Sequence, residues 1–261
     1  MNLEQSRVVE HKVCTGDYRL LVIGAASIAA AAKPGKFVHL RVPGLEAAVL
    51  RRPFSILSTS DDCISILYKP VGKGTRMMTQ LAPDAEVSLM GPLGNGFREP
   101  DPRSTPVVVA GGYGVAPLLF LARECGREGV AFIGGATADD ILCAEDFAKL
   151  SWDVRVATED GSVGTKGFVT KALDDWIGSE SPPDREPEVF ACGPEGMLKA
   201  VGERAIENGW HGWLSLDRRM GCGVGACLVC VQRIQDEDGN VKWARVCRDG
   251  PVFEAREIFW D

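Results

Sequence analysis

Four of the nine cysteines lie close together near the C-terminal end of the chain. They follow the spacing Cys222-x4-Cys227-x2-Cys230-x16-Cys247. This spacing is typical of plant-type [2Fe-2S] sites, in which thiolates hold two irons. Glycines alternate through the same segment at Gly221, Gly223 and Gly225, and they allow the backbone to wrap closely and to point its amides at the sulfurs. The pattern predicts a metal site that carries single electrons.

A structural zinc site is the first alternative, because four thiolates would also suit zinc. Zinc sites more often use two C-x2-C pairs, so the four-residue gap with interleaved glycines favours iron and sulfide. Buried free thiols are a further alternative. A disulfide framework is disfavoured by the odd number of cysteines. The cysteines outside the motifs are expected to serve packing: Cys14, Cys63, Cys125 and Cys143.

Two short motifs in the first hundred residues could bind phosphate. The string RRPFS at 51–55 supplies Arg52, whose planar guanidinium can hold an anion with two hydrogen bonds. The string VGKGT at 71–75 places Gly74 and Thr75 at the start of a predicted helix, where free N–H groups favour phosphate. RRPFS alone is a weak signal, since a solvated arginine and a strand-edge serine would explain it equally well.

Two further motifs each fall between a predicted strand and a predicted helix. GGYGVAP at 111–117 could hold a pyrophosphate, although Pro117 replaces the third glycine of the usual fingerprint. The next strand ends in GGAT, without the acid that binds ribose. CGPEGM at 192–197 follows another strand, at the end where open α/β sheets bind ligands. The alternatives are a tight turn without a ligand and, for Cys192, a small buried side chain.

The elements that position these motifs indicate three domains. Residues 1–100 contain six short strand-like runs, which predict an antiparallel barrel or sandwich, with one short helix at 75–81. After a linker at 99–106, strand and helix patterns alternate four times through residues 101–216, which predicts a parallel sheet, and residues 178–188 form a polar loop. Residues 217–261 are too few to bury much core, so a metal would stabilise them.

Composition excludes several classes of protein. Lysine and arginine number 29 against 36 acidic residues, and the net charge of −7 with no basic run argues against nucleic-acid binding. The longest apolar stretch, residues 20–32, is too short to cross a bilayer. The first residues lack the pattern of a secretory signal. We therefore expect a cytoplasmic protein that is not attached to a membrane.

The order of the motifs resembles that of a known superfamily. RPFS, GKGT, GGYGVAP and CGPEGM follow one another on a predicted barrel and α/β pair, as in ferredoxin–NADP reductases. The C-terminal strings MGCGVGACLVCVQR and RVCRDGPVFEAREIFW narrow the resemblance to the electron transfer subunits of type B dihydroorotate dehydrogenases. TEDGSVGTKGFVT at 158–170 is similar too, and the resemblance covers essentially all 261 residues. One departure is Ala110, where the family commonly has a glycine.

The resemblance implies a role for each matching residue. The residues implied to contact FAD are Arg52, Pro53, Phe54 and Ser55, with Ser55 near the isoalloxazine, then Leu67, Tyr68 and Lys69 beside the flavin or its ribityl chain, and Gly74 and Thr75 at the pyrophosphate. The residues implied to shape the nicotinamide site are Gly111, Gly112, Gly114, Pro117, Cys192, Gly193 and Pro194. The cluster ligands are Cys222, Cys227, Cys230 and Cys247.

The implied activity is that of an NAD-linked iron–sulfur flavoprotein oxidoreductase subunit in pyrimidine biosynthesis. A catalytic partner subunit carries FMN and oxidises dihydroorotate, and electrons pass through the [2Fe-2S] cluster and FAD to NAD+. The implied complex has two copies of each subunit. Hydride transfer needs no side-chain acid or base, so no catalytic residue is expected, and the three histidines (His11, His39 and His211) are expected to be structural or on the surface. Preference between NAD and NADP stays open.

Two other functions remain open from the sequence. A similar reductase subunit could serve a hydrogenase or a ferredoxin, because the identity of the partner is not written in this chain. A binding module stabilised by zinc, without redox activity, is the alternative from another class. The presence of RPFS, GKGT and all four clustered cysteines disfavours that module.

Overall fold

The computed structural model describes residues 1–45, 50–179, 185–236 and 238–260. Residues 180–184 of the polar loop predicted at 178–188 lie outside the described residues. Among the helices of the described ranges, none is long and apolar enough to cross a membrane.

The first part of the chain is a closed antiparallel barrel of six strands. In barrel order the strands are β1 (Asn2–Val13), β2 (Arg19–Gly24), β5 (Cys63–Tyr68), β4 (Arg52–Ser60), β3 (Phe37–Arg41) and β6 (Glu86–Leu93). Alternate residues such as Leu21, Ile23, Ile64 and Ile66 fill the barrel, because successive strand side chains point to opposite faces. Of the two predicted alternatives, barrel and sandwich, the structure has the barrel.

Two short helices accompany the barrel. Helix α1 (Ala26–Ala29) follows β2, and helix α2 (Lys73–Met78) follows β5. The start of α2 lies two residues before the predicted one, because the Gly72 backbone N–H donates to the Thr75 hydroxyl at 3.0 Å and caps the first turn there.

The second part is a seven-stranded sheet covered by helices. The strand order is β10 (Thr165–Lys166), β9 (Asp153–Thr158), β8 (Val130–Gly135), β7 (Thr105–Gly111), β11 (Pro187–Cys192), β12 (His211–Ser215) and β15 (Val252–Glu254). Every neighbouring pair is parallel except β12 with β15. The prediction of an α/β domain with a parallel sheet is confirmed, and its α-helices are α3 (Val115–Cys125), α4 (Ala144–Lys149), α5 (Val169–Ile177) and α6 (Glu195–Glu207).

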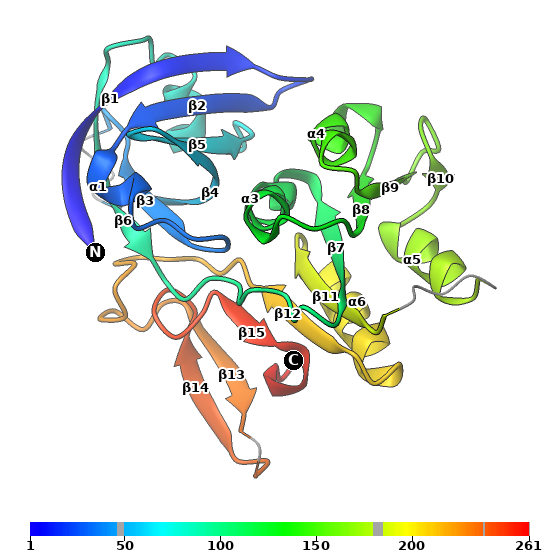
Figure 1. The fold of residues 1–261 in the computed structure, drawn as a ribbon. Coiled ribbons are helices and arrows are strands. Elements are labelled where there is room, and N and C mark those ends of the chain that lie inside the picture. Colours follow the sequence, from blue (N-terminus) through cyan, green and yellow to red (C-terminus); the bar gives the residue numbers. More distant parts are fainter. Residues whose placement is uncertain (46–49, 180–184, 237, 261) are drawn as a thin grey trace.

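The alternation along β7 sends side chains to two different cores. Val107 and Val109 pack with α5 and α6, whereas Val108 and Ala110 pack with α3. Figure 1 shows α3 between the sheet and the barrel, and Phe120 of α3 belongs to the barrel core. Helix α4 begins only at Ala144, because Cys143 has a left-handed backbone (φ +59°) that separates α4 from the short helix η2 (Ala138–Asp140).

The last part of the chain forms a hairpin and then pairs with the other two parts. A hairpin of β13 (Val231–Gln235) and β14 (Val241–Arg245) follows the cysteine-rich loop, and β15 then joins the edge of the α/β sheet (Figure 1). Asn95, just after the barrel, donates its backbone N–H to the Gly250 carbonyl at 2.6 Å. The short helix η3 (Ala255–Glu257) follows β15, and η1 (Gly112–Gly114) precedes α3.

One core joins all three parts, and we name it the shared core. It contains Phe37 and Leu93 of the barrel, Leu214 of the sheet, and Cys247 and Phe253 of the last segment. The three domains predicted at 1–100, 101–216 and 217–261 therefore pack as one unit, and their boundaries stay predictions.

We expect Phe253→Ala to lower the free energy of unfolding by about 3–5 kcal/mol, because it opens a cavity in the shared core. Urea unfolding followed by circular dichroism measures the change. Trp243→Ala is the matched control, since the Trp243 side chain is exposed and should cost less than about 0.5 kcal/mol. Equal costs for the two variants would show that β15 does not secure the last segment.

Candidate functional site

The loop of the first two clustered cysteines points its backbone amides at sulfur. Val224 and Ala226 donate N–H groups to Cys222 Sγ at 3.4 and 3.3 Å, and Cys222 N–H donates to Cys227 Sγ at 3.4 Å. Burial alone would raise the pKa of the Cys222 thiol, but the backbone donors of Val224, Cys227 and Ala226 outweigh it and lower that pKa to about 6. The loop thus favours thiolates, which are the form that binds metal.

The other two clustered cysteines form a second pair. Cys247 N–H donates to Cys230 Sγ at 3.4 Å, and both side chains are buried in the shared core. Burial, reinforced by the neighbouring Cys230 thiol, raises the pKa of Cys247 to about 12. The structure therefore arranges the four thiols two by two, with Cys227 at the surface and the second pair inside.

The pairing fits a two-iron cluster better than a single zinc ion. Each iron of a [2Fe-2S] cluster takes two thiolates, whereas a structural zinc ion gathers all four around one point. The donor set, four thiols with amides aimed at them, is the chemistry that a cluster requires.

The glycines of this loop are needed where they stand. Gly223 and Gly225 have left-handed backbones, with φ of +73° and +83°. A Cβ atom on Gly225 would lie 2.8 Å from Cδ of Arg248, and one on Gly223 would lie 2.7 Å from Cε1 of His39. Any other residue would be strained twice, by its φ angle and by its neighbours.

The structure brings the two phosphate motifs of the barrel together. The guanidinium of Arg52 lies over Gly74, where a Cβ atom would come within 3.1 Å of Arg52 Nε. Arg52 also donates to the Leu50 carbonyl. Three features therefore lie together on β4 and α2: the Arg52 guanidinium, the accessible backbone of Gly74 and the capped first turn at Thr75. This group of residues suits a pyrophosphate.

The Tyr68 hydroxyl is hydrogen-bonded to His11 of the barrel. His11 donates its Nδ1 proton to the Leu81 carbonyl at 2.7 Å, so its Nε2 accepts from the Tyr68 hydroxyl at 2.9 Å. Burial raises the pKa of Tyr68 to about 12. The ring of Phe54 meets Tyr68 edge to face, with centroids 6.0 Å apart. The Tyr68 hydroxyl proton is therefore already used by His11, which links Tyr68 to the Leu81 backbone.

Lys69 connects the barrel to the α/β part. Its Nζ lies 3.1 Å from Asp140 Oδ1, and the Tyr18 hydroxyl donates to the same oxygen at 2.8 Å. The ammonium also lies 4.7 Å from the centroid of the Tyr18 ring. We name this group the latch. The sequence analysis missed Tyr18 and Asp140, because neither belongs to a motif and they lie 122 positions apart. Leu67, by contrast, packs against the α3 side of the sheet.

The two nicotinamide motifs also meet in space. They follow β7 and β11, adjacent parallel strands in which Cys192 pairs with Ala110. A Cβ atom on Gly111 would lie 2.6 Å from Cδ of Pro194, and one on Gly114 would overlap the Cys192 carbonyl. The glycines thus permit the close approach of two loops at the carboxyl end of the sheet, where such sheets bind ligands.

The remaining residues of these motifs line the same corner. Pro117 lies in the first turn of α3, and Gly112 has a left-handed backbone (φ +54°) beside the Tyr18 hydroxyl. Cys192 is buried and hydrogen-bonded to Ser215, and burial raises its pKa to about 12, which keeps the thiol neutral. Gly193 packs against Met197.

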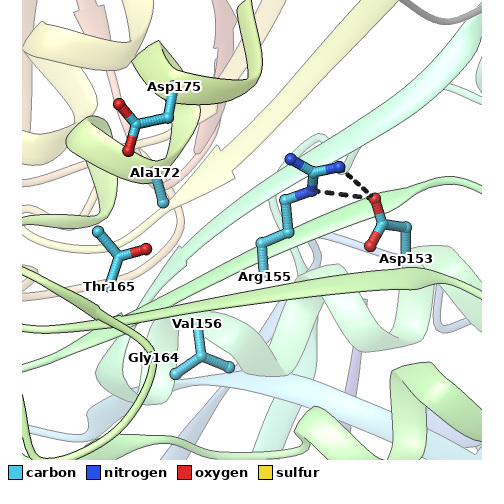
Figure 2. A pocket seen from close by; sticks show the side chains of 7 residues that line it. All are labelled: Asp153, Arg155, Val156, Gly164, Thr165, Ala172 and Asp175. Carbon is cyan, nitrogen blue, oxygen red and sulfur yellow. Dashed lines mark hydrogen bonds and ion pairs between the residues drawn. The ribbon is translucent and has the colours of Figure 1, made fainter. Parts of the chain in front are cut away.

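A cavity of about 420 Å³ lies elsewhere, between β9, β10 and α5. Figure 2 shows its lining, including the ion pair between Arg155 and Asp153, whose Nη2 and Oδ2 are 2.9 Å apart. None of the predicted site residues lines it. This cavity is therefore separate from the site assembled by the motifs.

Two segments of the chain match known families. Residues 217–259 match the iron-sulfur cluster binding domain of dihydroorotate dehydrogenase B, and residues 108–203 match the oxidoreductase NAD-binding domain. The first match contains all four clustered cysteines, and the second contains both nicotinamide motifs.

Two relatives that match nearly the whole chain carry the same name. The chain is 38% identical over 245 residues to the dihydroorotate dehydrogenase B (NAD(+)) electron transfer subunit of Desulforamulus reducens, covering 91% of this chain and 90% of that protein. It is 36% identical over 265 residues to the protein of the same name in Bacillus cereus, with 99% of each covered.

Solved structures share the fold. The NADH-dependent reduced ferredoxin–NADP oxidoreductase, a protein described for flavin-based electron bifurcation, superposes with a TM-score of 0.83 at 28% identity, covering 98% of this chain and 90% of that one. The cytochrome b5 reductase domain of Ulva prolifera nitrate reductase gives a TM-score of 0.65 at 18% identity, covering 80% of this chain and 94% of that one. The second likeness shows the fold alone.

The latch predicts a pH-dependent contribution to stability. Burial opposes the charge of Asp140, but hydrogen bonds from Tyr18 and Lys69 lower its pKa below the ordinary value. Because the pKa is lowered on folding, this contribution is present above the ordinary carboxyl pKa and is lost as the pH falls through the folded pKa. Asp140→Asn should therefore cost about 1–2 kcal/mol at pH 7 and less in acid.

Urea unfolding of the wild-type protein and of Asp140→Asn at several pH values measures how the cost of the substitution depends on pH. Asp139→Asn is the matched control, because Asp139 is exposed and lies outside the latch. A cost for Asp140→Asn that does not shrink in acid, or that equals the cost of Asp139→Asn, would contradict the latch.

Proposed function

Because the chain belongs to the family of dihydroorotate dehydrogenase B electron transfer subunits, we propose that it passes electrons to NAD+. These electrons come from the FMN of a catalytic subunit, which oxidises dihydroorotate. One observation carries the proposal in this chain. The cluster loop lies directly on the strand pair that holds the flavin motif, since Gly223 contacts His39 and His39 pairs with Pro53. Single electrons can pass between redox groups only over short distances, and this packing keeps the two sites together.

The cluster would be held by Cys222, Cys227, Cys230 and Cys247. The amides of Val224 and Ala226 stabilise the Cys222 thiolate, and the shared core shields Cys230 and Cys247 from water. Backbone hydrogen bonds to sulfur and exclusion of solvent are the means by which a protein tunes a cluster.

FAD would be held on β4, β5 and α2. When bound, FAD exchanges hydride with a nicotinamide and single electrons with an iron–sulfur cluster. Arg52, with Gly74 and Thr75, would bind the pyrophosphate. Pro53, Phe54 and Ser55 would contact the ring system. The latch fixes Lys69 at the end of β5, and Leu67 and Tyr68 support the site from the hydrophobic cores.

The nicotinamide would lie over the two loops at the carboxyl end of β7 and β11. Gly111, Gly112, Gly114 and Gly193 would admit it close to the backbone, and Pro117 and Pro194 would hold the loops rigid. The neutral Cys192 thiol places no negative charge there. Hydride transfer requires orientation and exclusion of water, and no side-chain acid or base is assigned.

An electron transfer subunit works with a catalytic partner subunit. We propose that this partner contains FMN and docks at the exposed edge of the cluster loop. Cys227 is at the surface there, and the neighbouring Leu228 and Val229 side chains are 62% and 58% exposed. The heterotetramer with two copies of each subunit and the cytoplasmic location stay predictions.

One observation favours a second candidate function. The structure resembles the NADH-dependent reduced ferredoxin–NADP oxidoreductase over 98% of the chain at 28% identity. A reductase subunit that serves a ferredoxin or a hydrogenase would use the same three sites with another partner.

Co-expression with candidate partners separates the two functions. We expect an FMN-containing subunit to co-purify, and the complex to reduce NAD+ when dihydroorotate is added. A complex that forms only with a hydrogenase or ferredoxin component, and that ignores dihydroorotate, would overturn the proposal in favour of the second candidate.

Cys227→Ser should abolish the cluster and dihydroorotate-dependent reduction of NAD+, while NADH still reduces artificial acceptors through FAD. Iron, sulfide and FAD analysis, with both assays, tests this expectation. Cys63→Ser is the matched control, because Cys63 lies on β5 outside the cluster and should leave iron content unchanged. Loss of FAD and of the folded state in Cys227→Ser would mean that this cysteine serves structure instead.

Gly114→Ala should raise the KM for NADH about tenfold, which is about 1.4 kcal/mol, since its methyl group would displace the Cys192 loop. Steady-state reduction of an artificial acceptor by NADH measures it. Gly196→Ala is the control, because a Cβ atom at Gly196 meets no neighbour within 4 Å. An unchanged KM in Gly114→Ala would remove these loops from the nicotinamide site.

A further inference from the structure

His39 is a buried side chain whose ring nitrogens have no partner. It lies on β3 with 0% of its surface exposed, and neither Nδ1 nor Nε2 has a hydrogen-bond partner among the described residues. Leaving a buried polar group unpaired costs about 1–3 kcal/mol, so native proteins seldom do it without a reason. The established activity assigns this histidine no role.

The ring of His39 occupies the boundary between the flavin motif and the cluster loop. Across β3, His39 pairs with Pro53 of the flavin motif. Next to it, the ring of Phe37 lies with its centroid 5.7 Å away. Toward the cluster loop, a Cβ atom on Gly223 would lie 2.7, 2.8 and 3.0 Å from Cε1, Nδ1 and Nε2. Only a glycine at 223 leaves room for the imidazole.

The ring is held neutral in this place. Burial, with a further contribution from the positive charge of Arg51, lowers the pKa of His39 to about 4. A neutral imidazole has one N–H donor and one acceptor nitrogen. An N–H group that is buried, unpartnered and packed against Gly223, the residue after Cys222 in the chain, requires an acceptor that arrives with a bound group.

We propose that His39 is a positioning residue for electron transfer, and that its ring N–H donates a hydrogen bond to a sulfur of the bound cluster. This inference rests on the proposed function and adds to it a residue outside the cysteine motif. Donors to the sulfurs stabilise the reduced, more negative cluster, so His39 raises its reduction potential. The same contact fixes the spacing between the loop and the flavin strand.

A redox titration of the complete complex, followed by electron paramagnetic resonance, tests the role. His39→Leu removes the donor and should shift the one-electron equilibrium of the cluster about tenfold toward the oxidised form, which is 59 mV. His39→Gln retains a donor and should restore most of the shift. Phe37→Leu is the matched control, because it alters the adjacent packing without removing a polar atom, and should leave the potential unchanged.

A second measurement avoids variants that lose the cluster. This chain is labelled with ¹⁵N only in its histidine rings and is assembled with unlabelled partner subunit, and the reduced cluster of the complex is examined by pulsed electron paramagnetic resonance. A coupling to ¹⁵N is expected. It would come from His39, because His11 is hydrogen-bonded within the barrel to Leu81 and Tyr68, and the His211 ring lies on β12 against Trp213 and Glu254.

The outcomes separate the inference from the proposed function. A reduced cluster without ¹⁵N coupling, or a His39→Leu potential equal to that of wild type, would overturn the role of His39 while leaving the electron path intact. A coupling to the flavin semiquinone instead would assign the N–H to FAD and overturn the cluster contact. Wild-type complex that holds no iron would overturn the proposed function itself.

Discussion

The arrangement of the binding sites depends on the packing of the cysteine-rich loop against strand β3 of the barrel. Gly223 lies on His39 of β3, and this contact brings a segment near the end of the chain to the strand that pairs with β4, which carries the flavin motif. Several features hold the loop there: Asn95 bonds to Gly250, β15 pairs with β12, and the shared core buries Cys230 and Cys247. Without this packing the three binding sites would be separate modules.

The four clustered cysteines differ in burial, from the protein surface to the interior. Cys227 lies at the surface and Cys222 is favoured as a thiolate by backbone donors, whereas Cys230 and Cys247 are buried. A cluster held this way has one accessible end and one end within the protein. Such an arrangement suits a carrier that receives electrons from a partner on one side and passes them inward on the other, and the apolar Leu228 and Val229 at the accessible end suit a protein contact.

Much of this organisation could be predicted from the sequence, because it is encoded locally. The six strand-like runs predict a barrel or a sandwich, the αβ periodicity predicts the parallel sheet, and the cysteine spacing predicts the cluster ligands. The sequence does not reveal the latch or the role of His39, since a lone Asp140 or His39 has no pattern and acquires meaning only from residues far along the chain. Strand β15 is hard to predict for a similar reason, because it is three residues long and forms by pairing with an existing edge.

The central claim is that one chain holds a two-iron cluster and a flavin in electronic contact. Anaerobic purification, metal and sulfide analysis, and stepwise reduction by NADH test it directly. The account predicts about two irons, about two sulfides and about one FAD per chain, with a cluster resonance that grows as NADH is added. Zinc in place of iron, or a cluster that stays oxidised while the flavin is fully reduced by NADH, would contradict it.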